Sequence, residues 1–338
     1  MTQTATPQVA VIILNWNGRK LLSEFLPSVV KYTPVPLARV IVADNGSADD
    51  STTWLAERFP EVEVWKFPEN YGFAEGYNRC LARSEAPYTV LLNSDVSVDS
   101  DWVTPLYDFM ETHSRVGACQ PKILSYRRPD TFEYAGACGG YIDRHGYPYC
   151  RGRLMGTVEK DCGQYDTPLT DLFWATGAAL MVRTDLYRRA GGLDARFFAH
   201  MEEIDLCWRM KLLGYDIAVV PASRVYHLGG GSLDASNPRK TYLNFRNNLL
   251  MLYKNLPVER RRGVLLTRRL LDTVAWAKFM VTLDWKNAAA VWRAHRDFAR
   301  MRKYYPEAPD RDLLSGHARP DLLMQYYLKG HHLFSQLN

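Results

Sequence analysis

The sequence lacks the long apolar segments of a membrane-spanning chain. No stretch of its 338 residues approaches the ~20 consecutive apolar residues that cross a bilayer. The N-terminus also lacks a cationic region before its first apolar run, Val9–Leu14, and that run is too short for the core of a signal peptide. We therefore expect a cytoplasmic protein whose first apolar run is a buried strand.

Two common binding-site patterns are missing as well. The six cysteines form no Cys-x-x-Cys pair, which is the usual spacing of structural zinc ligands. Cys138, Cys150 and Cys162 lie evenly spaced around His145, which would permit a zinc site, but we expect reduced thiols, some of them buried. No Gly-x-Gly-x-x-Gly follows the first strand, and this argues against a dinucleotide site.

Positive charge is concentrated in one part of the chain. Residues 239–303 hold 16 of the 42 Lys and Arg residues but only 4 of the 37 Asp and Glu residues. An acidic body with a basic tail predicts a surface that meets anions, such as phospholipid headgroups or diphosphates. The tail carries no recognisable nucleic-acid recognition motif, so we expect no nucleic-acid partner.

The first 120 residues or so alternate apolar runs with amphipathic segments, a pattern typical of strands followed by helices. The predicted strands are 9–14, 39–43, 62–67 and 88–92, and the predicted helices are 19–31, 49–59 and 74–83. Such repeated units predict an α/β fold with a parallel, doubly wound sheet, in which ligands bind beyond the carboxyl ends of the strands.

Polar motifs follow these strands where that rule would place a ligand. Asn15–Gly18 follows the first strand, Asp44–Ser47 the second and Asn93–Asp95 the fourth, while Asn70–Asn78 opens the third helix. Each motif alone is a common turn sequence. Because they line one edge of the sheet together, they favour a nucleotide site.

Three carboxylates, Glu202, Glu203 and Asp205, fall within four positions at the start of a helical pattern. Carboxylates this close repel one another unless a cation, a substrate hydroxyl or a helix N-terminus compensates their charge. With the acidic Asn93–Asp95 motif, they indicate a metal-assisted group transfer with a carboxylate base.

These motifs resemble family 2 glycosyltransferases, in particular their bacterial rhamnosyltransferase-like branch, over about residues 8–235. The resemblance implies a GT-A fold: a nucleotide-binding, mostly parallel sheet flanked by helices, with a helical C-terminal extension. It divides the chain into a catalytic domain, 1–235, with a nucleotide-binding half of about 8–120 and an acceptor half of about 121–235, followed by a basic helical extension, 236–338.

The resemblance also implies an activity. The enzyme would move a sugar, with inversion, from a UDP- or dTDP-sugar to a hydroxyl of a glycan or a polyprenyl-diphosphate-linked acceptor. It would use Mg²⁺ or Mn²⁺ and serve bacterial cell-surface polysaccharide synthesis, peripherally at the inner face of the plasma membrane.

Site residues follow from the same resemblance. Those implied for the nucleotide are Asn15, Asn17, Asp44, Asn45, Gly72, Asn93 and Asp95, and those implied for the metal are Asp95, Asn93 and His227. Glu203 falls at the position of the catalytic base. Two departures matter: Asn93 replaces the first Asp of the D-x-D motif, and Glu203 replaces an Asp. Glu202 and Asp205 therefore remain alternative bases.

Two other functions compete with this interpretation. A sugar nucleotidyltransferase usually has a glycine-rich loop with Arg or Lys after its first strand, and Asn15–Lys20 lacks that pattern. A catalytically inactive binding protein would explain the two departures, but the retention of Asp95, the acidic cluster and His227 argues against it.

One apolar stripe lies within the basic tail. Its residues recur at spacings of three and four, and they are Leu266, Leu270, Val274, Ala277, Val281 and Trp285. Either the stripe packs a helix on the catalytic domain or it contacts anionic lipid. Upstream, Trp174 either stacks on a sugar or belongs to the core.

Overall fold

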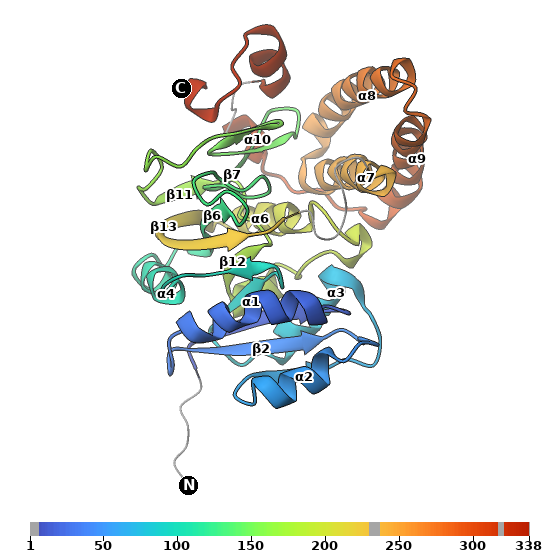
Figure 1. The fold of residues 1–338 in the computed structure, drawn as a ribbon. Coiled ribbons are helices and arrows are strands. Elements are labelled where there is room, and N and C mark those ends of the chain that lie inside the picture. The colour runs from blue at the N-terminus through green and yellow to red at the C-terminus, as the bar shows by residue number, and fades with distance from the viewer. Residues whose placement is uncertain (1–6, 230–236, 317–320, 338) are drawn as a thin grey trace.

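The computed structural model describes residues 7–229, 237–316 and 321–337. A nine-stranded sheet forms the centre of the molecule, and helices α1 to α6 flank it. Helices α7 to α9 form a separate layer at one corner, and a small second sheet lies above the central one (Figure 1).

Most strands are short, and their order along the central sheet is β11-β13-β6-β12-β4-β1-β2-β3, with β5 paired to β13. The strands of this sheet are β1 (Val9–Asn15), β2 (Ala38–Asp44), β3 (Glu63–Lys66), β4 (Tyr88–Leu92), β5 (Val96–Ser97), β6 (Val116–Ser125), β11 (Leu169–Leu172), β12 (Ala179–Arg183) and β13 (Asp216–His227). The second sheet consists of β7 (Gly140–Ile142), β8 (Pro148–Cys150), β9 (Arg153–Leu154) and β10 (Thr157–Val158).

Helices follow most of the parallel strands and dominate the chain after β13. They are α1 (Arg19–Tyr32), α2 (Ser51–Arg58), α3 (Gly72–Arg83), α4 (Val103–Thr112), α5 (Thr184–Arg189), α6 (Glu202–Leu212), α7 (Pro238–Asn255), α8 (Val258–Val281), α9 (Trp285–Met301) and α10 (Leu313–Gly316).

Both faces of the sheet are buried in hydrophobic cores. Alternate residues of β1 point to opposite faces, so Val11 and Ile13 pack in one core, while Ala10 and Ile12 pack in the other. This two-sided burial explains why the first strand is a continuous apolar run. The predicted parallel strands are confirmed, since β4, β1, β2 and β3 run parallel in that order.

The second half of the sheet is mixed. β12 inserts antiparallel between β4 and β6, and β11 and β5 pair antiparallel with β13. β13 is one long strand with an irregular register between Val220 and Arg224. The irregular segment 126–170 contains the small second sheet.

No helix among the described residues combines the length and the hydropathy required to cross a bilayer. The predicted α/β fold with helices on the sheet and a helical C-terminal part is confirmed.

Candidate active site

The polar ends of β1 and β2 lie side by side at one edge of the sheet. Asn15 is the register partner of Asp44, and its Nδ2 donates to Asp44 Oδ1 at 3.0 Å. Asp44 Oδ2 accepts a second hydrogen bond, 3.2 Å long, from the backbone N–H of Ser47. Both Asn15 and Asp44 are buried. Two donors therefore hold the Asp44 carboxylate in one orientation.

The other predicted nucleotide residues shape the loops around this edge. Asn17 is exposed, with φ of 50°, and its Oδ1 accepts from the backbone N–H of Ala48 at 2.8 Å. Asn45 is buried, and its Nδ2 donates to Asn70 Oδ1 at 2.9 Å and to the carbonyl of Gly72 at 3.1 Å. Gly72 begins α3 with φ of 75°, which favours glycine. These bonds tie the start of α3 to the end of β2.

A second cluster lies beyond the end of β4. Asp95 Oδ1 is 3.1 Å from Nε2 of His227, and Asn93 Nδ2 is 3.4 Å from the same nitrogen. β5 directly follows Asp95 and pairs with the end of β13, which places His227 there. The other ring nitrogen, Nδ1, is 3.6 Å from Oε1 of Glu133. Burial by itself would lower the pKa of His227, but the two carboxylates raise it to about 10.

The acidic helix α6 follows a segment with unusual backbone angles. Phe198, His200 and Met201 have φ values of 68°, 70° and 75°. Non-glycine residues in this region cost about 1–3 kcal/mol each, so other parts of the structure must hold the segment in place.

Helix α7 supplies these contacts. Asn247 is buried, and its Nδ2 lies 2.9 Å from the carbonyl oxygen of Phe197 and 2.8 Å from those of Ala199 and His200. Arg246 Nη2 donates to the same Phe197 carbonyl at 2.9 Å. We call these two side chains the α7 clamp, because they fix the backbone immediately before α6.

Glu203 lies beside a backbone segment that connects the two clusters. A Cβ added at Gly177 would lie 3.8 Å from the Cβ of Glu203. The next residue, Ala178, accepts a hydrogen bond at its carbonyl from the N–H of Asn93 at 3.0 Å. Residues 177–178 therefore lie beside the predicted acidic helix and also bind the first residue of the predicted metal motif.

The two glutamates of α6 have raised pKa values. Burial raises the pKa of Glu203 to about 7, against the opposing effect of backbone N–H groups at the start of the helix. Burial, with the neighbouring charge of Glu203, raises the pKa of Glu202 well above its usual value. Among the described residues, Oε2 of each has no hydrogen-bond partner, although both atoms are buried.

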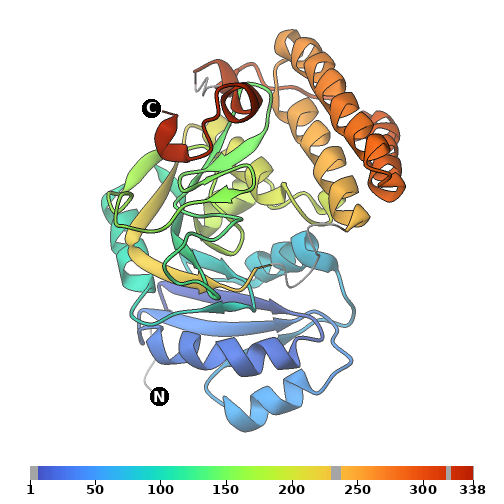
Figure 2. The ribbon, with the colours of Figure 1, turned by 45° about the horizontal axis from the view of Figure 1, so that its top comes forward.

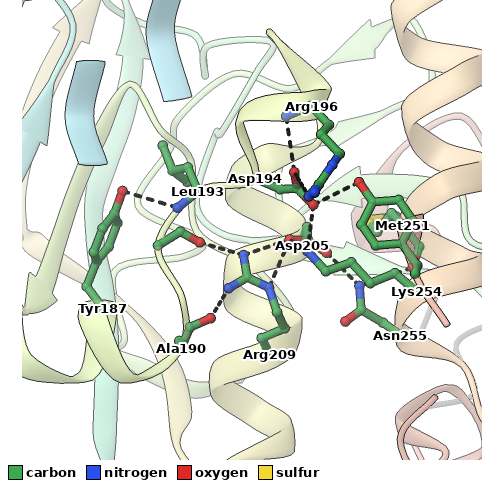
Figure 3. Close-up of polar contacts among 12 residues, drawn as sticks. Tyr187, Ala190, Leu193, Asp194, Arg196, Asp205, Arg209, Met251, Lys254 and Asn255 are labelled. Atoms are coloured by element: carbon green, nitrogen blue, oxygen red, sulfur yellow. Dashed lines mark hydrogen bonds and ion pairs between the residues drawn. The ribbon is translucent and has the colours of Figure 1, made fainter. Parts of the chain in front are cut away.

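Asp205 has a different environment (Figure 3). Its Oδ2 lies 2.9 Å from both Nε of Arg209 and Nζ of Lys254, and its Oδ1 accepts from Nδ2 of Asn255 at 2.7 Å. Burial would raise its pKa, but Arg209 and Lys254 hold the pKa of this carboxyl below its usual value. The network joins α6 to α7 and occupies both carboxylate oxygens.

Replacing Asp205 by asparagine is expected to destabilise the fold by about 3 kcal/mol, because it removes the charge that balances Arg209 and Lys254. Urea unfolding would measure this loss. As a matched control, Asp185→Asn changes the same charge at an exposed position and should change stability by less than about 0.5 kcal/mol. If Asp205→Asn abolished sugar transfer at unchanged stability, Asp205 would again be a candidate base.

The structure also bears on Trp174, on the cysteines and on the zinc alternative. Of the two alternatives for Trp174, the structure supports the core one, because the indole is buried and its Nε1 donates to the carbonyl of Tyr141 at 2.8 Å. All six cysteines are free, and five are buried. Over the part of the chain that the structure describes, no group of three or more metal-ligating side chains occurs, so the zinc alternative is not supported.

Two residues of the site were not predicted. Glu133 lies in the irregular segment before β7, and Asn247 lies within a helix of the basic tail. Neither belongs to a recognisable motif. The pair Asn247-Asn248, directly before the apolar run Leu249–Leu252, was the one available signal, because buried amides need hydrogen-bond partners.

Known proteins share this sequence pattern. The model of the glycosyl transferase family 2 matches residues 10–153. The N-acetylglucosaminyl-diphospho-decaprenol L-rhamnosyltransferase of Mycobacterium tuberculosis is 26% identical over 240 residues, which cover 66% of this chain and 76% of that protein.

Two solved structures share the fold. GalNAc-T7 with UDP, GalNAc and Mn²⁺ superposes with a TM-score of 0.59 at 15% identity, over 89% of this chain and 58% of that one. S. aureus TarS with UDP-GlcNAc gives 0.57 at 16% identity, over 87% and 81% of the two chains. Residues 10–153 are therefore similar to the family 2 glycosyltransferases, the chain has the GT-A fold, and its sequence is similar to a bacterial rhamnosyltransferase of that kind.

Proposed function

We propose that the enzyme transfers a sugar, with inversion, from a UDP- or dTDP-sugar to a hydroxyl of a lipid-linked glycan, with Glu203 as the base. One observation carries the proposal. Glu203 combines a pKa of about 7 with a carboxylate oxygen that has no hydrogen-bond partner among the described residues, and it lies beside Gly177, which precedes the residue that binds Asn93.

The donor nucleotide would bind at the edge formed by β1 and β2. Asp44 would accept the ring N–H of a pyrimidine, an edge that uracil and thymine share. Its fixed orientation supports this role, because Asn15 and Ser47 already align the carboxylate. Asn17, Asn45 and Gly72 would border the nucleotide mainly by shaping its loops.

A divalent cation, Mg²⁺ or Mn²⁺, fits the residues beyond β4. Asp95 and His227 would hold the cation: their Oδ1 and Nε2 are 3.1 Å apart, and the cation would replace the proton that the carboxylates now favour on the imidazole, since a ligating histidine is neutral. Asn93 would add a neutral contact. Glu133, at the other ring nitrogen, would orient the imidazole, as carboxylates often do for metal-bound histidines. When bound, such a cation neutralises negative charge on the departing diphosphate.

Glu203 is the best of the three candidate bases. Asp205 is ionised, but hydrogen bonds occupy both of its oxygens. Burial and the neighbouring charge of Glu203 raise the pKa of Glu202 well above its usual value, which favours its protonated form. Glu203 ionises near pH 7, so it can both accept a proton and release it afterwards.

The reaction is a single displacement. The acceptor hydroxyl gives its proton to Glu203, and its oxygen forms a bond to the anomeric carbon. The bond from that carbon to the diphosphate oxygen breaks on the opposite face, so the configuration inverts. One base and one charge-neutralising centre suffice, and no carboxylate nucleophile is needed.

The acceptor is proposed from similarity. The Mycobacterium tuberculosis relative is named for the acceptor N-acetylglucosaminyl-diphospho-decaprenol, and we propose a sugar on a polyprenyl diphosphate here as well. Such a reaction would belong to cell-surface polysaccharide synthesis and would take place at the inner face of the plasma membrane. We also propose that residues 1–235 form the catalytic domain and residues 236–338 its extension.

A thermal-shift panel of UDP, dTDP, GDP and ADP, each with and without Mn²⁺, tests the donor site. A bound nucleotide at 100 times its Kd stabilises the fold by about 2.7 kcal/mol. We expect the largest rise in Tm with UDP or dTDP, and only with Mn²⁺ present. A larger rise with GDP or ADP would contradict the role of Asp44.

A further inference from the structure

Helix α8 buries charged side chains and exposes apolar ones, the reverse of an ordinary surface helix. Arg268 and Asp272 are buried, whereas Leu266, Leu270 and Val274 are 62%, 65% and 68% exposed. A helix on a water-soluble body normally turns its apolar stripe inward and its charges outward. The apolar stripe predicted from the sequence therefore does not pack on the described part of the molecule.

The buried polar face of α8 binds side chains of α7 and α9, which fixes the orientation of the helix. Arg268 donates from Nη1 to Asn248 Oδ1 of α7 at 2.5 Å, and its Nη2 is 3.2 Å from Asp272 Oδ1. Asp272 Oδ2 is 3.1 Å from Nε2 of His295 on α9. Rotating α8 to bury the stripe would break the contacts of Arg268 and Asp272 with α7 and α9 and leave the buried Asn248 without its arginine partner.

The apolar surface continues around the turn between α8 and α9. Val281, Leu283 and Trp285 are 83%, 69% and 56% exposed, and Trp292 on α9 is 60% exposed. Turns on a water-soluble surface are usually polar. Both ribbon views place α8 and α9 at an outer corner of the molecule, with α7 facing the rest of the chain (Figures 1 and 2). A contiguous apolar surface of this kind marks a docking site.

Cations surround this surface. Exposed cationic side chains on the two helices include Arg262, Arg269, Lys278, Lys286, Arg293 and Arg300. Over the whole of α8 and α9, both of which are fully described, Glu259 is the only exposed acidic residue. The surface therefore combines apolar side chains with a strong positive charge.

A groove of about 500 Å³ runs between the two helices. Its walls include Arg269 and Trp276 from α8, and Trp292 and Arg296 from α9. Arginine and tryptophan together suit the boundary between water and lipid, where cations meet phosphates and indoles lie at the headgroup level.

We propose that helices α8 and α9 dock on an anionic lipid bilayer, with the apolar stripe and the α8–α9 turn among the upper acyl chains and the cations at the headgroup phosphates. Charge selects this occupant. A second copy of the chain would bring two cationic surfaces face to face, because a two-fold contact pairs a patch with itself. Docking on a bilayer would bring the enzyme to its lipid-linked acceptor, so the purpose of the docking rests on the proposed function. The vesicle-binding experiment does not depend on that acceptor.

Vesicle flotation of the full chain tests the docking. We expect binding to vesicles of phosphatidylcholine with phosphatidylglycerol to be at least about tenfold tighter than to phosphatidylcholine alone. This preference should fall at 1 M salt, where the screening length shortens from about 8 Å to about 3 Å.

A matched pair of substitutions locates the surface. Val281→Glu and Val35→Glu change the same residue type at sites with 83% and 85% exposure, but Val35 lies in the loop before β2, away from α8 and α9. We expect Val281→Glu to weaken vesicle binding at least about tenfold, and the double variant Leu270→Glu/Val274→Glu at least about hundredfold. Val35→Glu should bind as the wild type does.

Each other outcome overturns the docking: no binding to phosphatidylglycerol vesicles, equal binding by the wild type and the double variant, or a dimer in light scattering that the same substitutions dissociate. Circular dichroism would show that the variants are folded. Sugar transfer to a soluble acceptor analogue is measured separately. Its absence in a chain that still binds vesicles would refute the proposed function and leave the docking intact.

Discussion

Replacing Glu203 by glutamine is expected to lower kcat for sugar transfer about 1,000-fold, the typical contribution of a positioned general base. The amide keeps the shape of the side chain but cannot accept the proton of the acceptor hydroxyl. Nucleotide affinity should remain within about twofold, because Asp44 and Asp95 are unchanged. Steady-state kinetics and calorimetry of UDP or dTDP binding would separate the two effects. Unchanged turnover would remove Glu203 from the role of base.

The same substitution has a pH signature. Because only the ionised carboxylate acts as a base, kcat of the wild type should rise up to a pH of about 7 and then level off. The residual activity of Glu203→Gln should lack this step.

The contribution of Glu203 to the stability of the fold should fall as the pH rises, whereas kcat should rise. Burial raises the folded-state pKa of Glu203 from its ordinary value of 4.5 to about 7, so the folded chain binds this proton more tightly than the unfolded chain does. That stabilisation is complete below a pH of about 4.5 and is lost as the pH rises to about 7. Glutamine removes the cost of ionisation, so the variant should be more stable than the wild type at pH 8 by about 3 kcal/mol, but not at pH 4. Glu57→Gln, on the exposed face of α2, is the matched control and should change neither kcat nor stability.

Replacing Asp95 by asparagine is expected to weaken Mn²⁺-dependent nucleotide binding roughly 100-fold, since even an outer partner of a metal ligand typically contributes 10- to 100-fold. The amide is a poorer ligand for a hard cation than a carboxylate. Binding measured in a chelator should be weak and equal in the variant and the wild type. Titration of each protein with nucleotide at fixed Mn²⁺ gives the comparison.

Asp99→Asn provides a nearby control for Asp95→Asn. Asp99 is exposed and accepts a hydrogen bond from the hydroxyl of Tyr226, so its loss should leave nucleotide binding unchanged. Full transfer activity of the wild type in the presence of a chelator would contradict the metal scheme as a whole.

The sequence predicts the nucleotide half of the fold because that half obeys local rules. Each parallel strand is buried on two faces, so it is a continuous apolar run, and the polar motif that follows must lie at the sheet edge. Asn15 and Asp44 accordingly meet at 3.0 Å. By the same rule, Asn93 and Asp95 were expected directly after β4, and they follow its last residue, Leu92.

Other parts of the site depend on contacts between distant segments, which no local pattern encodes. Glu133 reaches His227 from a segment without periodicity, and the two lie 94 positions apart along the chain. The three carboxylates of α6 look equivalent in the sequence. They differ in the structure because Lys254 and Asn255 of α7 bind Asp205 alone.

The apolar stripe of α8 shows a further limit of sequence patterns. Spacing alone shows that Leu266, Leu270 and Val274 share a face, but not which face is buried. The opposite face of α8 is the buried one, because Arg268 and Asp272 form hydrogen bonds with side chains of α7 and α9 there.

The α7 clamp has a consequence for how this enzyme can be recombined with its relatives. The matched family region ends at residue 153, yet the backbone before the helix of the proposed base is held by Arg246 and Asn247, nearly a hundred residues further along the chain. A chimera joined between α6 and α7 would inherit its base from one parent and the tether of that base from the other. To exchange acceptor preference between relatives, the swapped segment should therefore begin before the acidic helix α6 and extend through α7.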